Sequence, residues 1–302
     1  MTEWSGCDSS AYVRLVESDG PLEEWPAKGM PLAWEFLRGL DSGMRGRASV
    51  TASNAASYTR RHTAPGALAS LFGESMSPAT ESAAGPGLPG TLAGVRVELR
   101  DRTGNTGNAG MVFVSPGQIN VQIPDGLQTG MASMFVYQGQ SLTHRDWLYV
   151  DASAPGLFAN DATGAGPPAG EVLYIRPDGS RVSGPLATAI PLTVGSSGFV
   201  SAPVQLGEPG TEVYVILYGT GWASAEAGSV KAMLGGETLL PEYAGRQGGF
   251  TGLDQLNLRL DTLPEETIAR LAGRVNPVSV CYGDVCSNRL QLLIEKALPA
   301  GQ

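Results

Sequence analysis

The chain has 302 residues, of which 42% are hydrophobic, so it can form two domains of ordinary size with a core in each. Its net charge of −9, from 20 Lys and Arg against 29 Asp and Glu, argues against nucleic acid or an anionic membrane as a partner, because both need a basic surface. No run approaches the roughly 18 apolar residues that span a bilayer. The 41 Gly and 21 Pro predict short strands joined by turns.

The first 46 residues form an N-terminal extension. In "MPLAWEFLRGL" (residues 30–40), Pro31 suits a helix start. Apolar residues then recur at helical spacing, namely Leu32, Phe36, Leu37 and Leu40. This extension could be a helix packed on the first domain or an arm that docks on another copy. The opening "MTEWSGCDSS" lacks the basic and apolar regions of a signal peptide. A mature exported protein, or a sequence whose start codon was placed too late, would look the same.

The rest of the chain contains one design twice. Four blocks occur in the same order in both halves: residues 64–75, 92–101, 115–124 and 139–150, and then 208–221, 228–237, 252–261 and 283–294. In the last block the spacing matches without a gap, so that Arg145 corresponds to Arg289. We therefore predict two domains of one fold, residues 47–151 and 152–302.

The blocks have the alternation of β-strands. Apolar residues occupy every second position in "VRVEL" (95–99), "VYVIL" (213–217) and "LNLRL" (256–260). Turn-rich connections and the lack of alternating helices predict an all-β fold of two tandem immunoglobulin-like antiparallel β-sandwiches. After the Pro/Gly-rich link at residue 152, "VLYIRPDGSRV" (172–182) predicts a hairpin of the second domain. Residues 77–90 are predicted to form a surface loop of the first.

Two strands carry the same pair of amides. "SPGQINVQIP" places Gln118 and Asn120 on the polar face, and "GLDQLNLRLD" repeats them as Gln255 and Asn257. Their recurrence favours a structural role over a binding role. We expect these side chains to hydrogen-bond neighbouring loop backbone and to fix the turn before each strand.

Cys281 and Cys286 flank "YGDV", in which Gly283-Asp284 suits a two-residue hairpin loop. In that register the two cysteines face each other in a non-hydrogen-bonded pair, close enough for a disulfide. A disulfide here would indicate export from the reducing cytosol, and the alternative is two reduced core thiols. Cys7 has no evident partner.

Six motifs carry a family resemblance: "NAASY…APGALASLFGES", "VSPGQINVQIP", "APGLFAND", "VILYGTGW", "YAG…GLDQLNLRL" and "CSNRLQLLI". In order, over roughly residues 50–294, they resemble the uncharacterised C-terminal domain of acidobacterial (Solibacter-type) secreted proteins, which is related to the IPT/TIG class of immunoglobulin-like folds. The resemblance implies an exported or surface-attached β module with no established activity. The missing signal peptide and the N-terminal extension depart from the family pattern.

The sequence shows no catalytic constellation. Its two histidines, His62 and His144, are expected to be solvated, and no nucleophile elbow, metalloprotease helix or phosphate loop occurs. "YGTGW" (218–222) is expected to be a strand that ends in a turn where Gly supplies a positive φ. "DRTGNTGN" offers oxygen ligands for Ca²⁺ in Asp101, Asn105 and Asn108, but their spacing does not match the twelve-residue, helix-flanked calcium-binding loop. We therefore expect no enzyme, cofactor or metal site.

Two non-enzymatic roles remain. A glycan-binding patch could form from Trp222, Tyr243 and Phe250, although the same aromatics could instead cap the core. Weakly charged sheet edges favour pairing with other copies or other surface proteins. The expected function is therefore a structural or adhesive role at the cell surface or outside the cell, with self-assembly into a polymer as one form of it. A carbohydrate-binding accessory module is the alternative.

Overall fold

The computed structural model describes residues 50–85, 87–193, 196–225 and 228–297. All of them belong to the compact unit that begins at Arg47. The N-terminal extension, its predicted helix and Cys7 lie outside the described residues.

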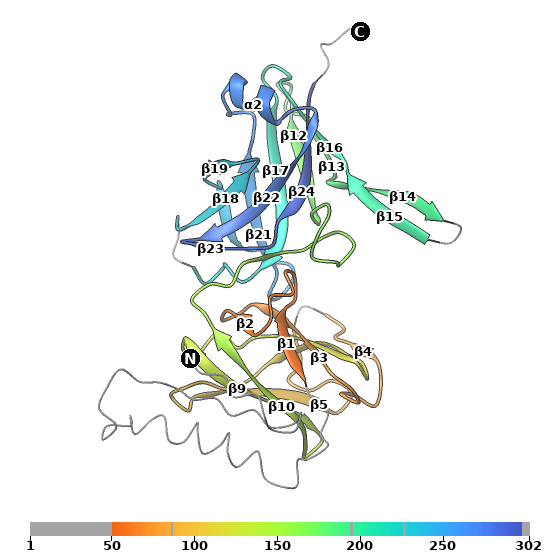
Figure 1. Cartoon of the computed structure of the whole chain (residues 1–302), viewed down its shortest axis with the longest axis vertical. Helices are drawn as coiled ribbons and strands as arrows, with labels where there is room; N and C mark the ends of the chain where they lie inside the picture. Colours follow the sequence, from red (N-terminus) through yellow and green to blue (C-terminus); the bar gives the residue numbers. More distant parts are fainter. Residues whose placement is uncertain (1–49, 86, 194–195, 226–227, 298–302) are drawn as a thin grey trace, which may run out of the picture. The chain divides into compact units, whose positions relative to one another are not determined.

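Residues 51–150 form two five-stranded sheets (Figure 1). Their strands are β1 (Thr51–Asn54), β2 (His62–Thr63), β3 (Leu68–Phe72), β4 (Glu81–Ser82), β5 (Val95–Arg100), β6 (Thr106–Asn108), β7 (Gly110–Val114), β8 (Gln118–Gln122), β9 (Gly130–Gln138) and β10 (Ser141–Val150). One sheet has the order β1-β3-β8-β7-β4 and the other β2-β10-β9-β5-β6.

The chain from residue 156 to residue 296 forms two larger sheets and a separate hairpin. The elements are β11 (Gly156–Leu157), β12 (Gly170–Ile175), β13 (Arg181–Pro185), β14 (Ala187–Thr193), β15 (Ser196–Ser201), β16 (Pro203–Leu206), β17 (Glu212–Thr220), β18 (Val230–Leu234), β19 (Glu237–Leu239), β20 (Tyr243–Arg246), β21 (Asp254–Arg259), α2 (Glu265–Leu271), β22 (Arg274–Tyr282), β23 (Val285–Cys286) and β24 (Leu290–Lys296). The sheets have the orders β13-β12-β17-β21-β20, with β11 on β17, and β16-β24-β22-β18-β19, with β23 on β22.

The two halves share one topology. The path β1-β3-β8-β7 corresponds to β12-β17-β21-β20, and β2-β10-β9-β5-β6 corresponds to β16-β24-β22-β18-β19. The four repeated sequence blocks contain β3, β5, β8 and β10 in one half and β17, β18, β21 and most of β24 in the other. Both halves even pair one short strand in parallel with the last long one, β2 with β10 and β16 with β24. The prediction of an all-β sandwich fold is confirmed.

Each half has its own core. Val95, Val97 and Leu99 are fully buried in a cluster made of residues 50–150, and Leu256 and Leu258 are fully buried in a cluster made of residues 157–294. The period of two in the sequence sends these side chains to one face of each sheet. Burying each one stabilises the fold by about 1.5–3 kcal/mol.

One helix, α2, was not predicted. Its start is marked by Pro264 and by acidic Glu265 and Glu266 in the first turn, and Arg270 lies in the last turn. These are favourable positions relative to the helix dipole. Ile268 and Leu271 of α2 are buried in the core of residues 157–294. The start and end residues in "LPEETIARL" (263–271) indicate a short helix, although the surrounding sequence has the alternation of strands.

The Pro/Gly-rich link is held by two asparagines. Asn54 Nδ2 donates to the carbonyl of Ala154 (2.8 Å). Asn288 Oδ1 accepts from the N–H of Leu157 (2.9 Å), and its Nδ2 donates to the carbonyls of Leu157 (2.9 Å) and Gly164 (2.8 Å). The link is therefore tied by side-chain amides rather than free.

The second half also contains the predicted hairpin and one that was not predicted. β12 and β13 pair antiparallel around a turn in which Gly179 has φ +80°, as expected from "RPDGS". β14 and β15 then pair with each other as a separate two-stranded sheet, and Figure 1 shows this ribbon extending beyond the neighbouring sheets.

Candidate functional site

The outer face of the sheet that contains β17 and β21 gathers aromatic and polar side chains. Strand register places Tyr218 opposite Gln255, and it places Ile216 opposite Asn257, which in turn lies opposite Tyr243. Paired residues project to the same side of a sheet. We call this surface the tyrosine–amide face, and its members are Glu171, Leu173, Tyr214, Ile216, Tyr218, Tyr243, Gln255 and Asn257, all half-buried except Tyr243, which is 42% exposed.

The repeated amides bond to each other. Gln255 Nε2 donates to Asn257 Oδ1 (2.8 Å), and Gln118 Nε2 donates to Asn120 Oδ1 (2.7 Å) in the first half. The predicted bond from these side chains to loop backbone is therefore wrong, because residues two apart on a strand lie on one face within reach of each other. Among the described residues, Gln255 Oε1 and Asn257 Nδ2 keep an acceptor and a donor without a protein partner.

The tyrosines of this face are fixed by hydrogen bonds. Tyr218 Oη donates to Glu171 Oε1 and Tyr214 Oη to Glu212 Oε2, both over 3.1 Å. Partial burial and these bonds to carboxylates raise the pKa of both tyrosines, so both rings remain neutral. The Tyr243 hydroxyl donates to the carbonyl of Arg246. Each of the three tyrosine hydroxyls thus has a protein acceptor.

The equivalent face of the first half carries fewer aromatics. Phe72 lies opposite Gln118 as Tyr218 lies opposite Gln255. Phe113 lies opposite Asn120 as Tyr243 lies opposite Asn257, and Leu68 lies opposite Gln122. The amide pair and two aromatic neighbours are therefore common to both halves, but the aromatics are phenylalanines in the first half and tyrosines in the second, and Leu68 stands in place of Tyr214.

The aromatic patch predicted from the sequence does not form as a unit. Trp222 is 1% exposed and belongs to the core, so it cannot stack on a ligand. Its assignment to a glycan-binding patch is therefore wrong. Phe250 is 69% exposed in the loop before β21, and Tyr243 belongs to the tyrosine–amide face. The alternation in "EVYVILY" (residues 212–218) indicated this face. Val213 and Val215 project into the core, so Tyr214 and Tyr218 project to the outer face of the same strand.

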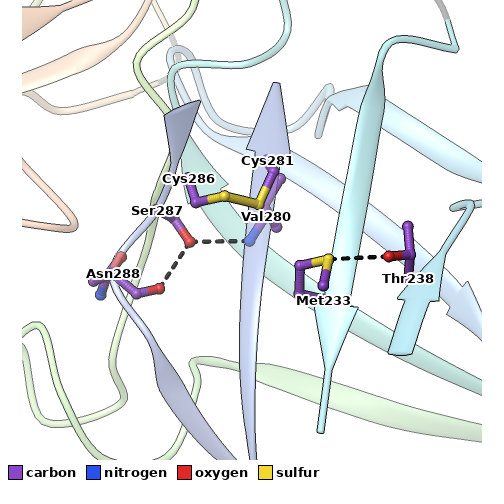
Figure 2. Close-up of a disulfide and its surroundings, with 7 residues drawn as sticks. All are labelled: Met233, Thr238, Val280, Cys281, Cys286, Ser287 and Asn288. Carbon is purple, nitrogen blue, oxygen red and sulfur yellow. Dashed lines mark hydrogen bonds between the residues drawn. A yellow bond between two sulfur atoms is a disulfide. The ribbon is translucent and has the colours of Figure 1, made fainter. Parts of the chain in front are cut away.

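Cys281 and Cys286 form a disulfide with an S–S distance of 2.04 Å and a Cα–Cα distance of 4.0 Å (Figure 2). Cys281 pairs with Cys286 and Tyr282 with Val285 around the two-residue loop, so the predicted register is confirmed. Beside the bridge, Ser287 Oγ accepts from the N–H of Val280 (3.0 Å) and donates to the carbonyl of Asn288 (2.8 Å), which ties β23 to β22 a second time.

The two histidines differ in exposure. His144 is 4% exposed, and its ring nitrogens lie 2.9 Å from the Glu74 carbonyl and 3.1 Å from Thr143 Oγ1. The expectation of a solvated His144 is therefore wrong, because the side chain is buried and contacts the backbone of the loop that follows β3. His62 is exposed and lies 2.8 Å from Asp151 Oδ2.

The loop considered for Ca²⁺ is held by its own donors. Asp101 is buried, which acts to raise its pKa, but hydrogen bonds outweigh burial and lower the pKa below its ordinary value. Its Oδ2 accepts from the N–H of Gln128, and its Oδ1 accepts from the N–H groups of Thr103 and Asn105. Within the described ranges, no group of three or more His, Cys, Asp or Glu side chains could hold a metal ion.

A second outer face carries stacked arginines. The guanidinium of Arg96 on β5 lies 3.7 Å from the ring centroid of Tyr137 on β9, and that of Arg61, which directly precedes β2, lies 4.1 Å from the ring centroid of Trp147 on β10. Such contacts stabilise by about 0.5–1 kcal/mol at exposed sites. The sequence alone does not predict this face, because its Arg and aromatic residues lie on different strands.

No protein-family model matches the sequence, and no curated protein matches it. Among solved structures, similar chains include the Bacteroides ovatus mixed-linkage glucan utilization locus protein SGBP-B in complex with a heptasaccharide (10% identity, 80% of this chain, 49% of that chain, TM-score 0.31). Others are a putative bacterial DNA-binding protein of Bacteroides vulgatus (19%, 33% and 45%, TM-score 0.25) and bovine butyrophilin (10%, 79% and 94%, TM-score 0.21). The chain spans less than half the length of the first two.

Proposed function

We propose that this chain is a non-enzymatic adhesive module that works outside the reducing cytosol and binds a neutral polysaccharide through the tyrosine–amide face. One observation carries the proposal: Tyr214, Tyr218 and Tyr243 lie on the same sheet face as the unpaired Gln255 Oε1 and Asn257 Nδ2. Sugar rings bind where aromatic rings cover their apolar faces and amides bind their hydroxyls.

The charges of the chain favour an uncharged ligand. A protein with net charge −9 repels acidic polymers at long range. On the face itself, the carboxylate of Glu171 already accepts from Tyr218, and Arg259 bonds to Asp261 at 3.0 Å and pairs with Glu212 at 3.2 Å. The groups left for a ligand are thus the amides and the rings of Tyr218 and Tyr243, because the Arg259 guanidinium already lies over the Tyr214 ring, 5.6 Å from its centroid.

Two observations support a location outside the cytosol. The Cys281–Cys286 disulfide is of a kind that persists in oxidising compartments. The resemblance to exported acidobacterial domains leads to the same expectation. In the described part of the chain, no helix has the length and hydropathy to cross a membrane.

Binding can be tested with a panel of neutral glucans, mannans and xylans, measured by affinity electrophoresis and then by calorimetry on the full chain. Tyr218→Ala should weaken binding about tenfold, because it removes a ring from the face, whereas Tyr218→Phe keeps the ring and should bind within about twofold of the parent. Asn257→Asp replaces the free donor by an acceptor and should also weaken binding about tenfold.

Asn120→Asp is the matched control, since it changes the same position of the same amide pair in the other half. It should leave binding unchanged. No binding to any polysaccharide of the panel would reject the proposal. Equal loss from Asn120→Asp and Asn257→Asp would contradict a site on the second half.

A further inference from the structure

The hairpin β14–β15 has no counterpart in the first half. There, residues 55–61 alone join β1 to β2, whereas residues 176–202 separate the corresponding strands β12 and β16. The sandwich fold is thus complete without this hairpin. An isolated two-stranded ribbon is marginally stable in water, so its presence calls for a further contact.

The hairpin lies in an uncharged stretch of a strongly acidic chain. No Lys, Arg, Asp, Glu or His occurs between Arg181 and Glu208, although the chain as a whole has a net charge of −9. Two copies repel each other through that net charge. An uncharged segment that extends beyond the sheets is where two copies can approach at the lowest electrostatic cost.

The two edges of the hairpin are not equivalent. β14 contains Pro191, and proline occurs in sheets on edge strands with its nitrogen toward the open side, where it blocks further pairing. β15 contains no proline, and among the described residues it pairs with no strand other than β14. Its last residue, Ser201, is anchored by a hydrogen bond from Oγ to the carbonyl of Gln291 (2.7 Å).

We propose that β15 pairs antiparallel with β15 of a second copy across a twofold axis, which gives a four-stranded sheet in the order β14-β15-β15-β14. Such a contact is self-complementary and closed, as in most homodimers. With Val200 placed opposite Val200 of the second copy, this 43% exposed side chain gains an apolar cross-strand neighbour. This inference is independent of the polysaccharide site, because it involves other strands.

The test compares two valines of equal exposure. Sedimentation equilibrium of the full chain, carrying Cys7→Ser to exclude an intermolecular disulfide, should show a reversible dimer that strengthens as salt screens the net charge. Val200→Lys should weaken the dimer at least about tenfold, because a lysine on the edge opposes pairing. Val182→Lys, on the edge strand β13 and 42% exposed, is the control and should dimerise within about twofold of the parent.

Hydrogen exchange gives a readout that needs no variant. The backbone N–H groups of residues 198–200 should become better protected as the protein concentration rises, whereas those of β13 should not. A chain that stays monomeric at every concentration, or a dimer weakened equally by both lysines or by neither, would overturn the proposal. So would protection of β13 in place of β15.

Discussion

The carboxylate of Asp254 accepts a hydrogen bond from the backbone N–H of Trp222, with an Oδ2–N distance of 2.9 Å. The same oxygen accepts from the N–H of Ala223 at 3.0 Å. Asp254 begins β21, and Trp222 follows the turn at the end of β17, so one buried side chain joins the turn to the neighbouring strand.

This carboxyl group should make stability depend on pH. Burial raises the pKa of Asp254 to about 6, even though the N–H groups of Trp222 and Ala223 and the charge of Arg246 oppose the shift. An unfolded Asp has a pKa near 3.9, so the folded state binds the proton more tightly. The resulting stabilisation is complete below about pH 4 and is lost as the pH rises through about 6, by about 3 kcal/mol in the free energy of unfolding.

Urea unfolding between pH 4 and pH 8 measures this effect. Asp254→Asn keeps an acceptor for the two N–H groups and does not titrate, so its free energy of unfolding should change less over this range. An identical pH dependence in the parent and in Asp254→Asn would assign the effect to other groups.

Gly221 should not tolerate a side chain. Its φ is +95°, and a Cβ there would lie 2.1 Å from the Ala154 carbonyl oxygen. Gly221→Ala should therefore lower the free energy of unfolding by more than about 2 kcal/mol. Gly179→Ala is the control, because Gly179 has φ +80° with open space around it and should cost about 1 kcal/mol. Equal losses in the two variants would show that the backbone angle matters and the contact does not.

Trp222 should contribute to stability and not to ligand binding. Trp222→Ala removes a ring that is 1% exposed and should cost about 3–5 kcal/mol. The indole N–H is buried without a hydrogen-bond partner among the described residues, so Trp222→Phe removes an unsatisfied group and should cost less. Chemical denaturation gives the order of stabilities, and a loss of polysaccharide binding by folded Trp222→Phe would place the ring in the ligand site after all.

The disulfide should stabilise the second half modestly. It closes a loop with a sequence separation of 5, for which the chain-entropy model gives about 2 kcal/mol. The double change Cys281→Ser and Cys286→Ser should lower the free energy of unfolding by that amount, and reductant should have the same effect on the parent. Reductant should leave the double variant unchanged, and a shift there would have to come from Cys7.

The sequence was sufficient for the features that depend on local order. Alternation such as Val95, Val97 and Leu99 determines which face of a strand is buried, and the short loop between Tyr282 and Val285 brings Cys281 opposite Cys286. The "RPDGS" turn follows from the same reasoning, because Gly179 adopts a positive φ that few other residues accept. The repeat predicted strands of equal order in both halves, and the sheets confirm it.

Only the tertiary structure decided which side chains meet. Tyr243 joins Asn257 through strand pairing, His144 becomes buried by a contact 70 residues away, and Trp222 enters the core. The side chains of Gln118 and Asn120 hydrogen-bond to each other and not to a loop. The sequence shows that both amides are present, but it does not show which acceptor each donor reaches. Local patterns fix how a strand presents its residues, whereas the neighbours of each residue depend on which strands pair and in which register, and that is settled by the packing of the whole sheet.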